Sequence, residues 1–220
     1  MAKAAARGTI PPKLDFTAPV VRETDDSALV AGDDREGERF VDLDLRDLNL
    51  TGSTFQDCEF AGVSFNGVQL RGSRFVDTLF SDPFAPVFLA ARSTWRSVLI
   101  ESPRLGSAEL FESALNSVHI LGGKIDYLNL RNATLTDVLF ENCVITDLDL
   151  AGAKSTRVSL LNCRVGTLES ANATNSSLDL RTTEFAAING LDGLAGATID
   201  DYQLSLLAPV MASHLGLVVE

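Results

Sequence analysis

A repeat of five residues runs through most of the chain. Every fifth residue from 40 to 190 is apolar at all but four of the 31 positions, and none of them is charged. The exceptions are Ser155, Ser170, Asn175 and Gly190. A second series two residues earlier, from 43 to 188, is small or apolar and also free of charge. Since 22% of all residues are charged, we expect both series to point into a core.

A period of five excludes a straight helix and a flat strand. On an α-helix, five residues advance by roughly 500°, so the apolar stripe would wander around the axis. On a strand, an odd period would place successive inner residues on opposite faces. Glycine, aspartate and asparagine, which favour turns, recur two residues after the first series. The pattern therefore predicts a solenoid that bends once per repeat.

Runs such as FVDLDLRDLNLTGSTFQDCEF and NLRNATLTDVLFENC resemble the pentapeptide-repeat family, over about residues 38–190. The resemblance implies a bacterial protein and a right-handed, four-sided β-helix of about 7–8 coils, with four repeats per coil. At ~4.8 Å between stacked strands, the rod would be roughly 37 Å long. We expect an irregular N-terminal lead-in and cap at 1–37, the β-helix at 38–190, and a C-terminal helical cap and dimerisation segment at 191–220.

The stretch 81–95 departs most from the repeat. Alanines stand at two inner positions that are usually large, Ala85 and Ala90, and prolines stand at Pro83 and Pro86. Because proline lacks a backbone N–H and alanine fills little space, we expect a bulge or a distorted coil here.

The C-terminal tail reads as two short helices. Asp200 or Asp201 is suited to cap the first, Pro209 to begin the second, and Gly216 to end it. One apolar stripe comprises Leu204, Leu207, Met211 and Leu215. A second comprises Leu206, Val210 and Leu217. Either the first covers the open coil while the second joins a homodimer, or both stripes pack on the rod.

Residues twenty apart should stack on neighbouring coils, so each side of the rod can be read separately. One side carries an outward apolar stripe. Its candidate interface residues are Leu79, Leu99, Leu121, Leu139 and Leu161. Such a stripe can bind a partner, can be covered by the N-terminal segment, or can simply be tolerated. The covering residues would be Leu14, Phe16, Val20 and Val21.

The net charge of −12 argues against direct binding of nucleic acid, which needs a basic surface. Some relatives that the resemblance brings in are acidic, dimeric rods that occupy the DNA site of DNA gyrase or another type II topoisomerase. A mimic of this kind would use acidic side chains on the rod. The candidates are Asp137, Glu141, Asp147 and Asp149.

The sequence contains no pattern that predicts a catalytic site. The two histidines, His119 and His214, lie far apart, and no zinc or nucleotide motif is present. The three cysteines occupy inner positions, where they read as small core residues, although Cys143 and Cys163 are spaced to stack and could form a disulfide. We expect no enzyme, metal or cofactor, no membrane span or secretion signal, and a cytoplasmic location.

Two functions remain. The first is a non-enzymatic rigid rod that acts as a protein-interaction or adaptor module for an unidentified partner. The second is the acidic mimic that binds DNA gyrase or another type II topoisomerase and protects it from a quinolone or a toxin. The resemblance supports both, and a contiguous acidic surface would favour the second.

Overall fold

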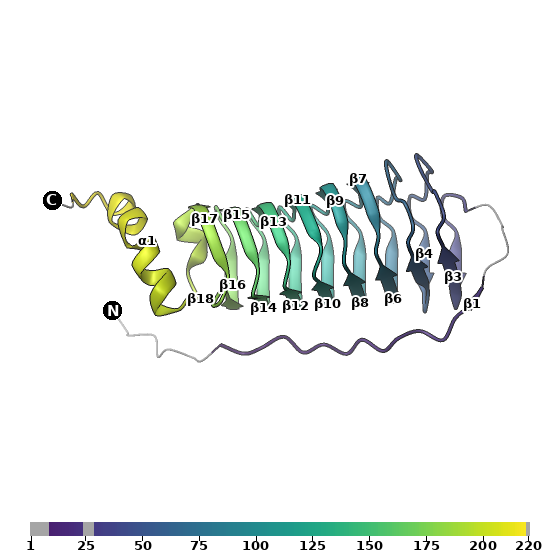
Figure 1. Cartoon of the computed structure of the whole chain (residues 1–220), viewed down its shortest axis with the longest axis horizontal. Coiled ribbons are helices and arrows are strands. Elements are labelled where there is room, and N and C mark those ends of the chain that lie inside the picture. The colour runs from purple at the N-terminus through teal and green to yellow at the C-terminus, as the bar shows by residue number, and fades with distance from the viewer. Residues whose placement is uncertain (1–8, 24–28, 219–220) are drawn as a thin grey trace.

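The computed structural model describes residues 9–23 and 29–218 of the chain. They form a four-sided parallel β-solenoid of about eight turns that ends in a single helix (Figure 1). The larger sheet contains β1 (Arg22–Glu23), β2 (Asp34–Glu36), β3 (Glu38–Val41), β4 (Thr54–Gln56), β5 (Glu59–Ala61), β6 (Arg74–Ser81), β8 (Thr94–Glu101), β10 (Ala114–Leu121), β12 (Thr134–Glu141), β14 (Lys154–Leu161), β16 (Thr174–Asp179) and β18 (Ala197–Thr198). The smaller sheet contains β7 (Phe84–Leu89), β9 (Arg104–Glu109), β11 (Lys124–Asn129), β13 (Val144–Asp149), β15 (Arg164–Glu169) and β17 (Glu184–Asn189).

Each coil takes twenty residues, and equivalent residues stack directly. Leu115 pairs with Leu135 in a parallel ladder, and the same offset joins the strands from β2 to β17. The large inner side chains stack as well. The rings of Phe55 and Phe75 lie 5.5 Å apart, and those of Phe75 and Trp95 lie 4.3 Å apart. The repeat thus builds one continuous core, because every coil places the same kind of side chain at the same point.

The corners explain the turn-forming residues. Asp42 and Gly62 occupy the same corner on successive coils, and both adopt the left-handed conformation, with φ of 51° and 65°. This conformation favours glycine, asparagine and aspartate. A side chain at Gly62 would collide with the carboxylate of Asp42. Glycine at this point leaves room for the carboxylate of Asp42 beneath it.

The predicted inner register is confirmed, with one exposed member. Both series are buried or half-buried along the rod, except that Leu48 is 36% exposed. Leu48 belongs to the first complete coil, and the position twenty residues before it lies outside the described residues. The prediction that every member of the two series would be buried is wrong at this end, because no described coil stacks on that side of Leu48.

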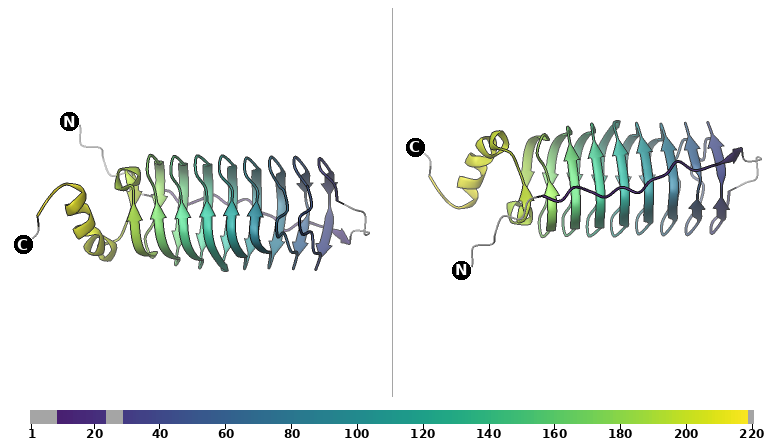
Figure 2. Two further views of the ribbon diagram at one scale, coloured as in Figure 1. Left: turned by 90° about the horizontal axis from the view of Figure 1, so that it is seen from above. Right: turned by 90° about the horizontal axis from the view of Figure 1, so that it is seen from below.

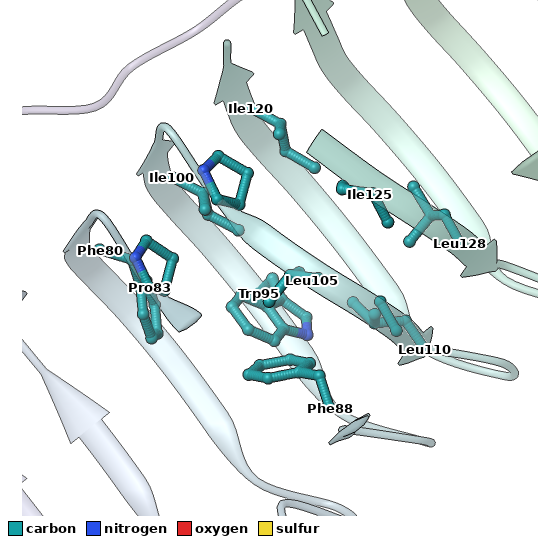
Figure 3. A pocket seen from close by; sticks show the side chains of 12 residues that line it. Phe80, Pro83, Phe88, Trp95, Ile100, Leu105, Leu110, Ile120, Ile125 and Leu128 are labelled. Carbon is teal, nitrogen blue, oxygen red and sulfur yellow. The ribbon is translucent and has the colours of Figure 1, made fainter. Parts of the chain in front are cut away.

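The predicted bulge in 81–95 is wrong. β7 pairs with β9 at the regular offset of twenty, from Phe84–Arg104 to Leu89–Glu109. Phe88, at the inner position that is usually small, is buried and points toward Trp95 (Figure 3). Ala85 and Ala90 are fully buried as well, and a cavity of about 30 Å³ lies beside Phe88, Trp95 and Leu105. In this coil the large inner side chain is Phe88 and the small ones are Ala85 and Ala90, and the strand pairing stays regular.

The stack begins earlier than residue 38. Within the predicted irregular lead-in, β2 pairs with β4, and Leu29 is buried in the core. Residues 9–23, which we call the N-terminal strap, run lengthwise along the rod from its C-terminal end to its first coil (Figures 1 and 2). There β1 pairs with β3. The segment that holds the four possible covering residues therefore lies along the rod.

The tail forms one α-helix, and the prediction of two is wrong. After the 3-10 helix η1 (Leu191–Leu194), α1 runs without interruption over Asp201–His214 and contains Pro209. The φ that proline imposes is helical, so Pro209 removes a hydrogen bond without ending the helix. Asp200 caps the start, as expected, by accepting from the N–H of Gln203. Gly216 ends it with φ of 71°.

Candidate interaction surfaces

The packed side of α1 closes the last coil through Gln203. Inside the rod, hydroxyl groups donate to carbonyls 23 residues earlier, as Ser73 does to Leu50. The Gln203 amide makes the same kind of bond to the carbonyl of Leu180 at 2.6 Å, and a second one to that of Thr183 at 2.7 Å. Because Gln203 continues the inner series one coil beyond Thr183, the helix begins in register with the rod.

The first predicted apolar stripe is only half correct. Leu207 is buried and Met211 is half-buried and packs against the core. Leu204 and Leu215 are instead 49% and 72% exposed. The helix approaches the rod with its first turns and then leans away from it (Figure 1). Residues near its end therefore have no coil to pack against.

The second stripe remains open to solvent on this chain. Leu206, Val210 and Leu217 are 55%, 43% and 61% exposed, and Tyr202 is exposed beside them. Leu206, Tyr202 and Phe185 help to line a groove of about 340 Å³ between α1 and the last coil. Exposed apolar side chains around a groove are typical of an interaction surface.

The same end carries an open sheet edge. β17 is the last strand of the smaller sheet, and no described strand pairs with its outer side. Most of its side chains are exposed, including Ala186 and Ala187. Such an edge offers backbone N–H and C=O groups to another chain. Groove, exposed helix and edge thus lie together, which the sequence suggested only for the helix.

The predicted apolar stripe on the rod is less exposed than expected. Four of its five residues are half-buried, and only Leu161 is exposed, at 37%. The four half-buried residues are Leu79, Leu99, Leu121 and Leu139. Among the proposed covering residues, Phe16 and Val21 are half-buried, whereas Leu14 and Val20 are exposed. The strap therefore does not cover the stripe with all four of its apolar side chains.

What holds the strap is a polar column that our sequence analysis missed. One residue per coil, at intervals of twenty, lies at the corner beneath the strap, and we call this column the corner ladder. It consists of Gly37, Asp57, Asp77, Ser97, Ser117, Asp137, Arg157 and Ser177. Ser97, Ser117 and Asp137 are almost fully buried. The signal was present as a polar residue at nearly every twentieth position.

The four acidic candidates do not form one surface. Asp137 is buried and forms a 2.5 Å ion pair with Arg157, which holds the pKa of its carboxyl below the usual range. Asp149 is buried and forms an ion pair with Arg131 at 2.6 Å. Glu141 contacts His119 at 3.0 Å. Asp147 is the exposed member of the set.

The remaining candidate chemistry is engaged within the fold. His214 lies 3.2 Å from Asp192. All three cysteines are free and buried. Burial raises the pKa of the Cys58 thiol to about 11. A hydrogen bond with the Cys163 thiol, together with burial, raises the pKa of Cys143. Among the described residues no three metal-binding side chains come together, and no helix is long and apolar enough to cross a membrane.

Residues 39–82 match the family model for pentapeptide repeats in eight copies. This part of the chain consists of pentapeptide repeats. Its coils continue in the same register beyond the matched residues, up to β17. No curated protein matches the sequence.

Several solved structures resemble this chain at low identity. A trypsin-treated form of QnrB1, a plasmid-mediated fluoroquinolone resistance protein, is 18% identical with a TM-score of 0.37, over 90% of this chain and 96% of that one. Full-length QnrB1 is 16% identical with a TM-score of 0.39, over 81% and 99%. HetL from the cyanobacterium Nostoc, involved in heterocyst differentiation regulation, is 13% identical with a TM-score of 0.32, over 78% and 91%.

Proposed function

We propose that the protein is a non-enzymatic interaction rod that binds through its C-terminal end, and that a second copy of the chain is its first partner. The observation that carries this proposal is the exposure of Leu206, Val210 and Leu217 beside the open edge of β17. Burial of apolar surface contributes roughly 25 cal/mol per Å², so these side chains favour association.

A symmetric contact suits this end of the rod. In a two-fold dimer the same patch meets itself, so each apolar residue is buried twice. The helix itself carries few charges, since α1 contains no charged residue after Asp201 apart from what His214 can carry. Charge repulsion between two copies is therefore small along the helix.

Light scattering tests the dimer directly. We expect a mass about twice the 23.6 kDa of the chain, falling to that of a monomer in a variant with Leu206→Glu and Val210→Glu. Ala208→Glu is the matched control, because Ala208 is exposed on the opposite side of α1. A wild-type monomer at high micromolar concentration would refute the proposal, provided that circular dichroism shows a folded chain.

The acidic mimic of DNA is the second candidate function. A net charge of −12 on a rod supports it, because a negative rod attracts the positively charged DNA groove of a type II topoisomerase. The ion pairs of Asp137 and Asp149 reduce their part in such attraction. Exposed carboxylates such as Asp147 and Asp82 would carry it instead.

A supercoiling assay with DNA gyrase tests the mimic. We expect inhibition that fades as salt is added, since exposed charges are screened. A variant with Asp147→Asn and Asp82→Asn should inhibit less, and Ser176→Asn, an exposed uncharged position, is the control. No inhibition at tens of micromolar protein would exclude gyrase inhibition and leave the interaction rod.

A further inference from the structure

The strap is bound to the rod mainly through its own backbone. The N–H of Ile10 donates to Ser177, that of Lys13 donates to Asp137 at 2.8 Å, and that of Asp15 donates to Ser117 at 2.8 Å. At the far end, the N–H of Arg22 donates to the carbonyl of Gly37. All four acceptors belong to the corner ladder. The corner ladder thus binds backbone N–H groups of the strap rather than particular side chains.

The side chains of the strap confirm this mode of binding. Ile10 is 51% exposed and Val20 is 95% exposed, although both are apolar. Other side chains do contact the rod: the carboxylate of Asp15 accepts a 2.8 Å hydrogen bond from the Ser97 hydroxyl, and the hydroxyl of Thr9 donates to that of Thr198 at 2.6 Å. Phe16 and Val21 are half-buried. Hydrogen bonds from Ser117 and Ser97 lower the pKa of Asp15. One acidic side chain is therefore recognised in addition to the backbone.

The spacing of the ladder matches an extended chain that contains proline. Ile10 and Lys13 are three residues apart, and their acceptors Ser177 and Asp137 are two coils apart. Three residues of a polyproline II helix rise ~9.3 Å, and two coils rise ~9.6 Å. Pro11 and Pro12, between these two anchors, have no N–H that would need a partner. Ile10 and Lys13 can therefore both meet the rod while prolines occupy the two positions between them, and the next anchor, Asp15, follows two residues later and one coil further along.

The polar side chains of the corner ladder suit an extended chain as their ligand. Asp137 is held by Arg157, with two hydrogen bonds from the guanidinium, and still accepts from the strap. Ser97 and Ser117 are buried because the strap passes over them. Without an extended chain, these groups would face water along a continuous polar corner.

We propose that the corner ladder is a docking site for an extended, proline-containing segment of a partner protein, with the strap as its occupant in the free protein. The partner segment would carry prolines between its anchoring N–H groups and an acidic residue that accepts from Ser97. This deepens the proposed function by assigning a second binding surface to the rod. It does not depend on association through α1.

An exchange experiment on the full chain tests the proposal. Residues 24–28 are replaced by the recognition sequence of a site-specific protease, the protein is folded, and the chain is then cut. The probe is a fluorescently labelled synthetic peptide with the sequence of residues 9–22. We expect its anisotropy to rise and saturate at one peptide per chain, and to fall when unlabelled peptide is added.

Matched variants distinguish specific binding of the peptide at the corner ladder from nonspecific adhesion of the peptide to the rod. A peptide in which Pro11→Gly and Pro12→Gly are both present should bind at least severalfold more weakly, because it loses its preformed extended shape. Ser117→Gly in the rod removes a hydroxyl at φ of 55°, a conformation that glycine adopts readily, and should also weaken binding. Asn116→Ala, at the exposed neighbouring position, should leave binding unchanged.

The result of the cutting and peptide-binding experiment either supports or overturns the proposed docking site. If the cut strap stays on the rod through gel filtration, the ladder holds a separate peptide and the proposal is supported. If the strap leaves and the labelled peptide does not bind at hundreds of micromolar, the proposal is overturned. Loss of the β-sheet spectrum when the strap leaves would also overturn it, because the strap would then be part of the fold. Light scattering of the uncut chain reports on the proposed dimer separately.

Discussion

The side-chain amide of Gln203 donates to the carbonyl of Leu180, 23 residues earlier, at 2.6 Å. The hydroxyls of Ser73 and Thr183 bridge the same interval to Leu50 and Leu160. A helical residue thus occupies a position of the inner series, where the rod places small or apolar side chains. This bond fixes where α1 begins and keeps the last carbonyls of the rod satisfied.

Replacement of Gln203 by leucine should therefore destabilise the C-terminal end. The carbonyl of Leu180 would keep only the 3.2 Å bond from the N–H of Thr183, and that of Thr183 would lose the amide of Gln203. Leaving a buried acceptor without a partner costs about 1–3 kcal/mol. We expect a lower midpoint in urea unfolding and faster amide exchange in α1. Leu204→Ala, at an exposed position of the same turn, should change the midpoint little. Equal midpoints for both variants would contradict the capping role.

The inner series should tolerate neither charge nor loss of volume. Leu130 is buried, so Leu130→Ala should lower the free energy of unfolding by about 2–5 kcal/mol, and Leu130→Asp should prevent folding. Thr134→Ala, at an exposed strand position, is the control for urea unfolding. Asn129→Asp is not a neutral control, because Asn129 donates to Glu109 at 2.6 Å and a carboxylate there would repel it.

Acid should loosen the strap before it unfolds the rod. The pKa of Asp137 is lowered by Arg157, and that of Asp15 by Ser117 and Ser97. A carboxyl whose pKa is lower in the folded state stabilises that state above its unfolded pKa, ~3.9, and this contribution is lost as the pH falls through the folded value. We expect proteolysis or amide exchange within residues 9–22 to increase below about pH 4, relative to the rod.

A variant isolates this effect. Asp15→Asn removes a titrating group while an amide oxygen can still accept from Ser97. The pH dependence of strap exchange should become shallower in this variant. An unchanged profile would mean that Asp15 does not hold the strap through its charge.

The three thiols should be unreactive in the native protein. Cys58, Cys143 and Cys163 are buried, and the raised pKa of Cys58, about 11, leaves little thiolate at pH 8. A disulfide-exchange reagent such as Ellman's should label them only after denaturation. A protein with Ser176→Cys should react at its exposed new thiol in the native state. Fast labelling of the wild type would indicate opening of the coils.

The sequence alone determined the solenoid and its register. A charge-free position every five residues leaves a chain no regular element except one that turns once per repeat, and twenty residues per coil then assign each residue to a side. It also marked the two ends of the helical tail, since Asp200 and Gly216 act through bonds to residues close in sequence, although Asp201 was an equal candidate for the cap and Pro209 was expected to divide the tail into two helices. These features depend on local chemistry, which a single sequence displays.

Only the tertiary structure decided where the ends of the chain lie on the rod. Lys13 meets Asp137 across 124 residues, and no local pattern marks either one for the other. The direction in which α1 leaves the last coil likewise decided that Leu207 is buried and Leu204 exposed, although both belong to one predicted stripe. Contacts of this kind depend on the geometry of the finished rod, because the partner surface exists only after the coils have stacked.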